Sequence, residues 1–94
     1  MRQYTTPEQT AKLIELGFEK PKSIVREYYD FDAVDMEKAY SIGELIEILG
    51  YDLYDIHYSG FSWEVESERE CAISENLIDA LYDMIVKLKE EGVI

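Results

Sequence analysis

The last part of the chain carries an apolar stripe at helical spacing. Between residues 76 and 91, apolar side chains recur three or four positions apart, with charged side chains between them. The stripe consists of Leu77, Ile78, Leu81, Met84, Ile85 and Leu88. Ser74 or Glu75 stands near the start of the predicted helix, and Gly92 closes it. The rest of the chain must therefore supply a surface that covers this stripe.

Two further helices are marked by capping boxes. Thr6–Gln9 starts a helix that ends at Gly17, and Ser41–Glu44 starts a helix that ends at Gly50. The first helix has a modest apolar face made of Ala11, Leu13 and Ile14. The second has a full stripe made of Ile42, Leu45, Ile46 and Leu49. Three helices with one apolar side each are expected.

Strands are predicted between the helices. Residues 24–31 are rich in β-branched and aromatic side chains, and Val25, Tyr29 and Phe31 are the candidates for burial. Residues 53–58 and 61–66 read as a hairpin that turns at Ser59-Gly60.

The hairpin register follows from pairing apolar residues. A two-residue turn sets Tyr58 opposite Phe61, Ile56 opposite Trp63, and Tyr54 opposite Val65, all on one side. The other side then pairs His57 with Ser62 and Asp55 with Glu64, which predicts a solvated face.

These elements predict one α+β domain over residues 1–94. The expected order is α-β-α-β-β-α, with three helices on one face of a short antiparallel sheet of about three strands. The sequence leaves the conformation of residues 32–39 and 67–74 open, although 30–38 can supply a second arm of a hairpin.

The charge distribution is uneven. Residues 1–26 hold five bases and three acids, giving +2, whereas residues 27–94 hold four bases and 18 acids, giving −14, for a total of −12. Such a surface repels phosphate, so we expect no direct nucleic-acid or anionic-membrane binding. No apolar run approaches the roughly 20 residues that span a bilayer. Cys71 is expected to be a small buried side chain in a reducing, cytoplasmic setting.

The residues that carry chemistry are sparse. His57 is the only histidine, and a triad of Ser62, His57 and Asp55 on an open sheet face would lack a pocket, so His57 is interpreted as a surface residue. One histidine and one cysteine are too few for a structural zinc site, and residues 30–41 do not match a calcium-binding loop. Gly43 at a helix start is interpreted as part of a cap. We predict no catalytic, cofactor or metal site.

Three stretches resemble small proteins of unknown function carried by prophages and mobile elements of Bacteroides-type gut bacteria. They are residues 4–17, residues 40–49 and residues 80–94. In that family, a Trp-Ser-Leu-Gly-like helix start and a closing Met-Ile-x-x-Leu-x-x-x-Gly-x-Ile-like helix recur. Here Tyr40 stands in place of the Trp, and the region between the second and last helices is short. The resemblance implies a bacterial, accessory, cytoplasmic protein and nothing about catalysis.

The function expected from these features is a non-catalytic protein-interaction module that presents an acidic surface to a basic protein. The candidate interaction surface comprises Asp30, Asp32, Asp35, Glu37, Asp55 and Glu64. One alternative is a nucleic-acid mimic that occupies a DNA-binding protein. The other is a small enzyme of unknown type, since a fold alone excludes no function.

Overall fold

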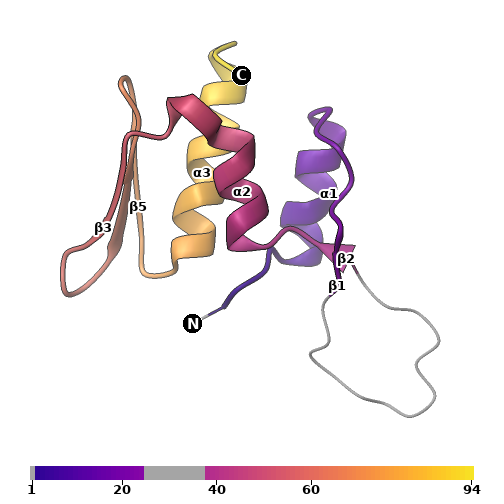
Figure 1. Cartoon of the computed structure of the whole chain (residues 1–94), viewed down its shortest axis with the longest axis horizontal. Helices are drawn as coiled ribbons and strands as arrows, with labels where there is room; N and C mark the ends of the chain where they lie inside the picture. The colour runs from indigo at the N-terminus through magenta and orange to yellow at the C-terminus, as the bar shows by residue number, and fades with distance from the viewer. Residues whose placement is uncertain (1, 25–37) are drawn as a thin grey trace.

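α3 (Leu77–Glu90) is the element against which most of the molecule packs. The computed structural model describes residues 2–24 and 38–94. α3 contacts α2 (Ile42–Leu49), and it also contacts β4 (Trp63–Glu66) and β5 (Cys71–Ser74), as Figure 1 shows. The buried residues of α3 are Leu77, Ile78, Ala80, Leu81, Met84, Ile85 and Leu88. The predicted stripe is therefore confirmed in full, with Ala80 added to it.

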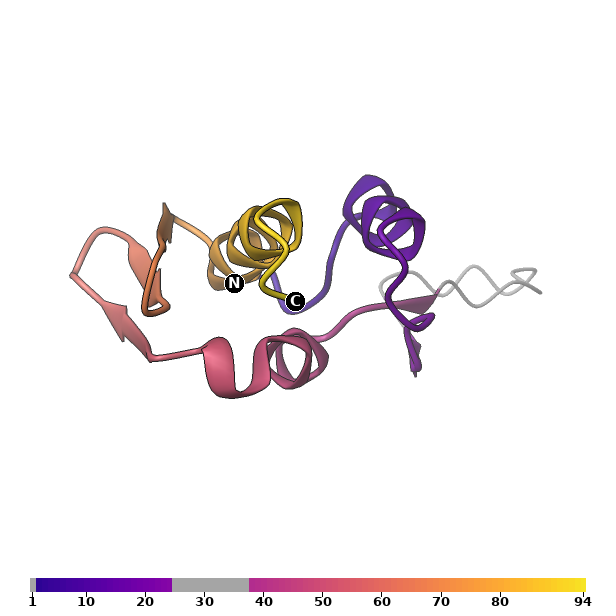
Figure 2. The ribbon, with the colours of Figure 1, turned by 90° about the horizontal axis from the view of Figure 1, so that it is seen from above.

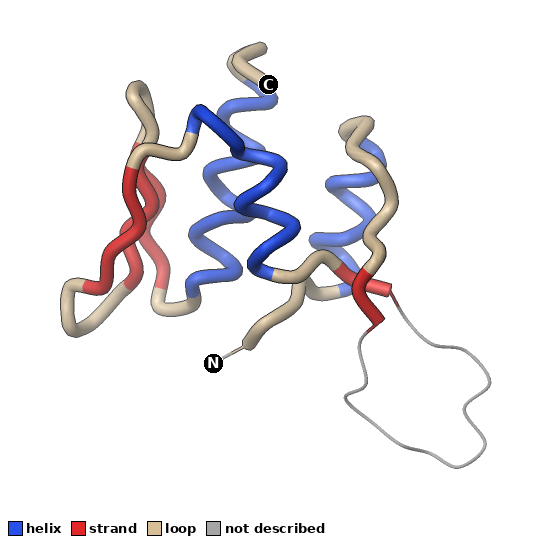
Figure 3. The backbone as a smooth tube through the Cα atoms, in the orientation of Figure 1, coloured by secondary structure: helices blue, strands red, loops and turns tan. Residues whose placement is uncertain are grey.

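The strands form two separate antiparallel groups, one on each flank of the helices (Figure 3). A two-stranded group pairs β1 (Ser23–Ile24) with β2 (Lys38–Ala39). A three-stranded sheet has the order β3-β4-β5, in which β3 spans Asp55–Tyr58. The α+β class and the order α-β-α-β-β-α are confirmed, and β5 fills part of the region that the sequence left open.

The helices form two layers. Seen from above, α1 (Pro7–Glu15) and α3 lie on one side and α2 lies on the other (Figure 2). A short 3₁₀ turn, Gly50–Asp52, leads from α2 to β3. One core cluster joins side chains from all three helices with Val65 and Ala72 of the sheet. No helix in the described ranges is long and apolar enough to cross a membrane.

Both predicted capping boxes are present. The Thr6 hydroxyl accepts a hydrogen bond from the backbone N–H of Gln9 at 3.2 Å, and the Gln9 side chain accepts one from the N–H of Thr6 at 3.0 Å. Ser41 and Glu44 make the same exchange at 3.2 Å in each direction. These bonds satisfy N–H groups that the first helical turn leaves without partners.

The buried face of α1 differs from the predicted one. Thr10 and Leu13 are buried, whereas Ala11 and Ile14 are exposed. The Thr10 hydroxyl can be buried because it donates to the carbonyl oxygen of Thr6 at 2.9 Å and lies 2.7 Å from the Thr5 hydroxyl. A threonine with satisfied hydrogen bonds thus takes the place that the apolar pattern assigned to its neighbours.

The predicted hairpin register is wrong by two residues. Tyr58 pairs with Trp63, and Ile56 pairs with Val65, so the turn centres on Gly60-Phe61 rather than on Ser59-Gly60. The N–H of Ser59 donates to the carbonyl oxygen of Ser62 at 2.9 Å, and Gly60 adopts φ = 100°. A glycine with positive φ at the first central position is typical of a type II′ hairpin turn.

The observed register changes the cross-strand pairs but leaves the side chains of both strands on the predicted sides of the sheet. Because side chains alternate along a strand, a shift of two leaves Ile56, Trp63 and Val65 on the side that faces α3. Tyr54 and Phe61 were predicted opposite Val65 and Tyr58 on the apolar side, but they are 77% and 90% exposed. Cys71 is also exposed rather than buried, because the alternation turns Ala72 inward instead.

The predicted strand over residues 24–31 is seen only at its start. β1 pairs Ser23 with Ala39 and Ile24 with Lys38. Val25, Tyr29 and Phe31 lie outside the described residues.

Candidate functional site

The side of the three-stranded sheet that points away from α3 is called the outer face. Strand alternation places on it Asp55 and His57 of β3, Glu64 and Glu66 of β4, and Cys71 and Ile73 of β5. The opposite side carries Val65 and Ala72, which are buried in the core with α3. The outer face thus gathers the only histidine of the chain and three of its carboxylate side chains on a small surface.

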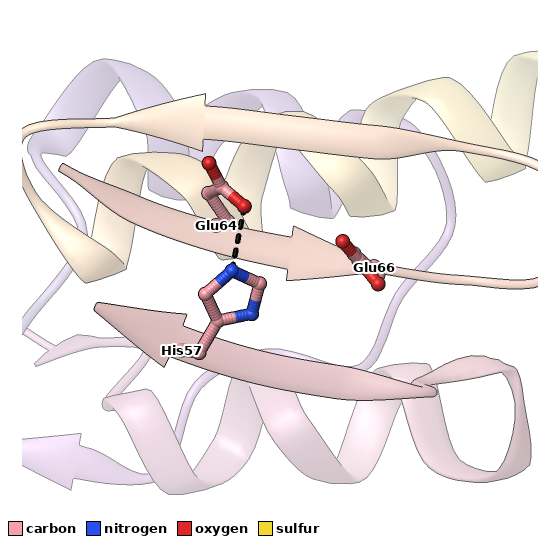
Figure 4. Close-up of side chains that lie close together, drawn as sticks. All are labelled: His57, Glu64 and Glu66. Atoms are coloured by element: carbon pink, nitrogen blue, oxygen red, sulfur yellow. Dashed lines mark ion pairs between the residues drawn. The ribbon is translucent and has the colours of Figure 1, made fainter. Parts of the chain in front are cut away.

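His57 lies between two carboxylates. Its Nδ1 is 2.8 Å from Oδ2 of Asp55, two residues earlier on β3, and its Nε2 is 2.6 Å from Oε2 of Glu64, directly opposite on β4. Figure 4 shows the ring pointing at Glu64, with Glu66 next along the same strand and the helices behind the sheet. One candidate ligand atom from each of His57, Glu64 and Glu66 lies within 4.8 Å of the other two.

The carboxylates change the acidity of the ring. The hydrogen bond with Asp55 raises the pKa of His57 above its ordinary value of 6.5; desolvation opposes this, and Glu64 adds to it. In its protonated form the ring donates one hydrogen bond to each carboxylate. The His57 side chain remains 43% exposed, which agrees with its interpretation as a surface residue.

The structure does not assemble Ser62, His57 and Asp55 into a triad. Ser62 belongs to the turn, where its hydroxyl lies 3.3 Å from that of Ser59. Nε2 of His57 is occupied by Glu64, so it is not available to activate a hydroxyl.

Only two members of the predicted interaction surface can be placed. Asp55 and Glu64 are not the like-charged cross-strand pair that was predicted, because the register puts Glu66 opposite Asp55 and His57 opposite Glu64. They are nevertheless brought together, one on each ring nitrogen of His57. Asp30, Asp32, Asp35 and Glu37 lie outside the described residues.

Sequence reasoning missed the role of Glu66 and the grouping around His57. A signal was present: Asp55 and His57 are two residues apart, as are Glu64 and Glu66, which puts each pair on one face of its strand. Only the pairing of the two strands brings the two pairs together. The register error therefore hid the cluster.

β3 is an edge strand that ends in an exposed tyrosine. Among the residues that the structure describes, no strand pairs with β3 on the side away from β4. The bond from Ser59 N–H to Ser62 sets the alternation of the ladder, so the backbone N–H and C=O groups of Ile56 and Tyr58 point away from β4. The Tyr58 side chain is 56% exposed, and its ring packs against Trp63 with centroids 5.1 Å apart.

Three open hollows of about 330–340 Å³ lie elsewhere on the surface. One is lined by Phe18, Tyr40 and Ile48 together with Lys22 and Glu44. Within the described residues, none of these three includes His57 or another outer-face residue. The charged cluster therefore does not coincide with any of these three hollows, whereas an enzyme site usually places its reactive groups in a concave surface.

Comparison of the chain with protein-family models, with curated proteins and with solved structures finds no match. The resemblance to prophage and mobile-element proteins stays a prediction.

Proposed function

We propose that this protein is a non-catalytic interaction module that binds an extended, basic segment of a partner protein along the free edge of β3. The observation that carries the proposal is the position of this edge. It combines backbone groups that no other described strand pairs with, the exposed Tyr58, and carboxylates on the outer face of β3 and β4. In β-strand addition, main-chain hydrogen bonds supply affinity and the alternating side chains supply specificity.

The two sides of an added strand would meet different surroundings. On the outer face, its side chains would lie beside Asp55 and His57, with Glu64 and Glu66 one strand further on β4, and the net negative charge of this group favours lysine or arginine. On the opposite side they would contact Tyr58, which favours apolar residues. The segment that suits both sides alternates basic and apolar residues.

The net charge of the chain and its exposed cysteine support the same proposal. The net charge of −12 steers basic molecules toward the chain from a distance, and the exposed thiol of Cys71 suits a reducing bacterial cytoplasm. A nucleic-acid mimic would present the same charge to a DNA-binding protein, but it would need no backbone pairing along β3.

The test is a titration with a short synthetic peptide that alternates lysine and valine, followed by NMR of the backbone amides. We expect the N–H signals of Ile56 and Tyr58 to shift and to become protected from exchange. Two matched controls are the same peptide with glutamate in place of lysine and the same peptide N-methylated at alternate residues. Both should fail to bind, the first through charge and the second through lost backbone donors.

Two outcomes would overturn the proposal. Either the lysine–valine peptide does not bind, or N-methylation leaves its affinity unchanged. Unchanged affinity would mean that charge alone attracts the peptide. Replacing Asp30, Asp32 and Asp35 with lysine in a separate variant tells whether those acids, rather than Asp55 and the other outer-face acids, hold the peptide. Part of the binding should survive above about 0.15 M salt, where screening acts over ~8 Å.

A further inference from the structure

We infer that the outer face of the β3–β4 hairpin binds a divalent transition-metal ion of the zinc class, with His57, Glu64 and Glu66 as ligands and Asp55 as the carboxylate that positions the ring. The inference does not depend on the proposed peptide binding. It rests on the arrangement of these four side chains.

The ligand atoms are already gathered. One ligand atom from each of His57, Glu64 and Glu66 lies within 4.8 Å of the other two, and Nε2 of His57 faces the Glu64 carboxylate. Zinc bound to nitrogen and oxygen at ~2.0–2.2 Å in tetrahedral geometry needs ligand atoms about 3.3 Å apart. The His57–Glu64 contact is 2.6 Å, so these two atoms would have to separate by less than about 1 Å for the ion to enter.

Asp55 sets the orientation of the His57 imidazole. Asp55 Oδ2 lies 2.8 Å from Nδ1, so Nδ1 can keep its proton and donate it to Asp55 while Nε2, which faces Glu64, binds the ion. A histidine that binds metal through one nitrogen and donates from the other to a carboxylate is the arrangement typical of zinc sites. The ion would take the place of the proton between Nε2 and Glu64.

The donor set selects the type of ion. One imidazole with two carboxylates suits zinc and its neighbours better than calcium, which takes six to eight oxygen ligands. Three protein ligands leave a position for water, as in zinc sites that are not purely structural. The count of Cys and His that led to the expectation of no metal concerns closed structural sites, so it does not apply to this site.

The experiment is a calorimetric titration of the tag-free Cys71→Ser protein with zinc chloride. This background removes the only thiol, which itself binds zinc. We expect one saturable site that His57→Gln abolishes. Asp55→Asn should weaken zinc affinity about 10–100-fold, which is the usual effect of losing the carboxylate behind a ligating histidine. Glu66→Gln should weaken binding, whereas Glu68→Gln, which removes the same charge from the neighbouring turn, should leave it unchanged.

NMR of the His57 ring gives a second readout that does not depend on stability. On adding zinc, Nε2 should show the metal-induced shift while Nδ1 keeps its proton. The inference is overturned if the Cys71→Ser protein has no saturable site, if His57→Gln binds zinc as well as its parent, or if Glu68→Gln weakens binding as much as Glu66→Gln. The last result would indicate diffuse attraction of cations by an acidic surface.

Discussion

α3 and the β3–β4 hairpin are held in place by different forces. α3 buries seven residues against α2 and two strands, so almost any rotation of this helix would expose apolar surface. The hairpin buries Val65 completely but leaves Tyr58 more than half exposed, and its outer face is charged. Apolar burial is the main interaction that positions α3, with Arg2 and Gln9 bonded to Asp79 at its margin, whereas the hairpin also depends on its turn.

The difference explains what each region can do. A helix enclosed on several sides has few side chains free for a partner, whereas a hairpin with one open face and one open edge presents both side chains and backbone groups. The polar contacts of the outer face do not add much stability in water, because exposed ion pairs contribute little. They instead orient His57 and the carboxylates around it.

The largest expected difference in the free energy of unfolding is between a substitution of a core leucine and one of an outer-face isoleucine. Leu81 is fully buried, so Leu81→Ala should lower the free energy of unfolding by about 2–5 kcal/mol through lost burial and the cavity left behind. Ile73 is 59% exposed, so Ile73→Ala should change it by less than about 0.5 kcal/mol. Urea denaturation of both variants measures the contrast. Similar losses would mean that the outer face is covered.

A second effect concerns the polar contacts at the start of α2. The Glu44 carboxylate accepts hydrogen bonds from the N–H groups of Lys22 and Ser41 and from the Ser23 hydroxyl, joining the segment around β1 to α2. Glu44→Gln should therefore cost about 1–2 kcal/mol at neutral pH. This loss would be smaller than that from a core leucine and larger than that from an outer-face residue.

The pH dependence of the Glu44 effect has a definite sign. Burial works to raise the pKa of Glu44, but the hydrogen bonds from Ser23, Lys22 and Ser41 outweigh it and lower the pKa below 4.5. A lowered folded-state pKa stabilises the protein above the ordinary value and stops doing so as the pH falls through the folded-state value. The difference between parent and Glu44→Gln should be full above pH 4.5 and shrink below it. A difference that grows on acidification would contradict the assignment.

The smallest effect tests which aromatic residues face each other in the hairpin. Tyr58 and Trp63 are cross-strand partners with tilted rings, so a double-mutant cycle to alanine should give a coupling energy of about 0.5–1.5 kcal/mol. Tyr58 and Phe61, the partners expected from the sequence, should couple by less than about 0.5 kcal/mol. Stronger coupling of Tyr58 with Phe61 than with Trp63 would indicate the turn at Ser59-Gly60 instead.

The elements that the sequence predicted well are those in which several local signals agree. Both capping boxes and the stripe from Leu77 to Leu88 combine a helix start, a 3.6-residue period and a glycine at the end. β5 carries no such agreement, since Cys71–Ser74 has four residues and only Ile73 strongly favours a strand. Its pairing with β4 comes from tertiary contacts with α3.

For the candidate site, the sequence predicts the face on which the residues lie, but not which of them contact one another. The face on which Asp55, His57 and Glu64 lie follows from strand alternation, and the structure bears it out. Their partners depend on which two residues occupy the centre of the turn, and the sequence Ser59-Gly60-Phe61-Ser62 allows the glycine at either central position. Pairing the aromatic residues selected the wrong one, because Tyr54 and Phe61 are not buried.

The turn at Gly60-Phe61 pairs β3 with β4 in the register that joins His57 to Glu64. Contacts between backbone Hα protons, measured by NMR, test it directly, because residues in non-hydrogen-bonded antiparallel pairs bring their Cα atoms to about 4.5 Å. We predict strong Hα–Hα contacts between Ile56 and Val65 and between Tyr58 and Trp63. Strong contacts between His57 and Ser62 and between Asp55 and Glu64 would instead establish the turn at Ser59-Gly60 and would separate His57 from Glu64.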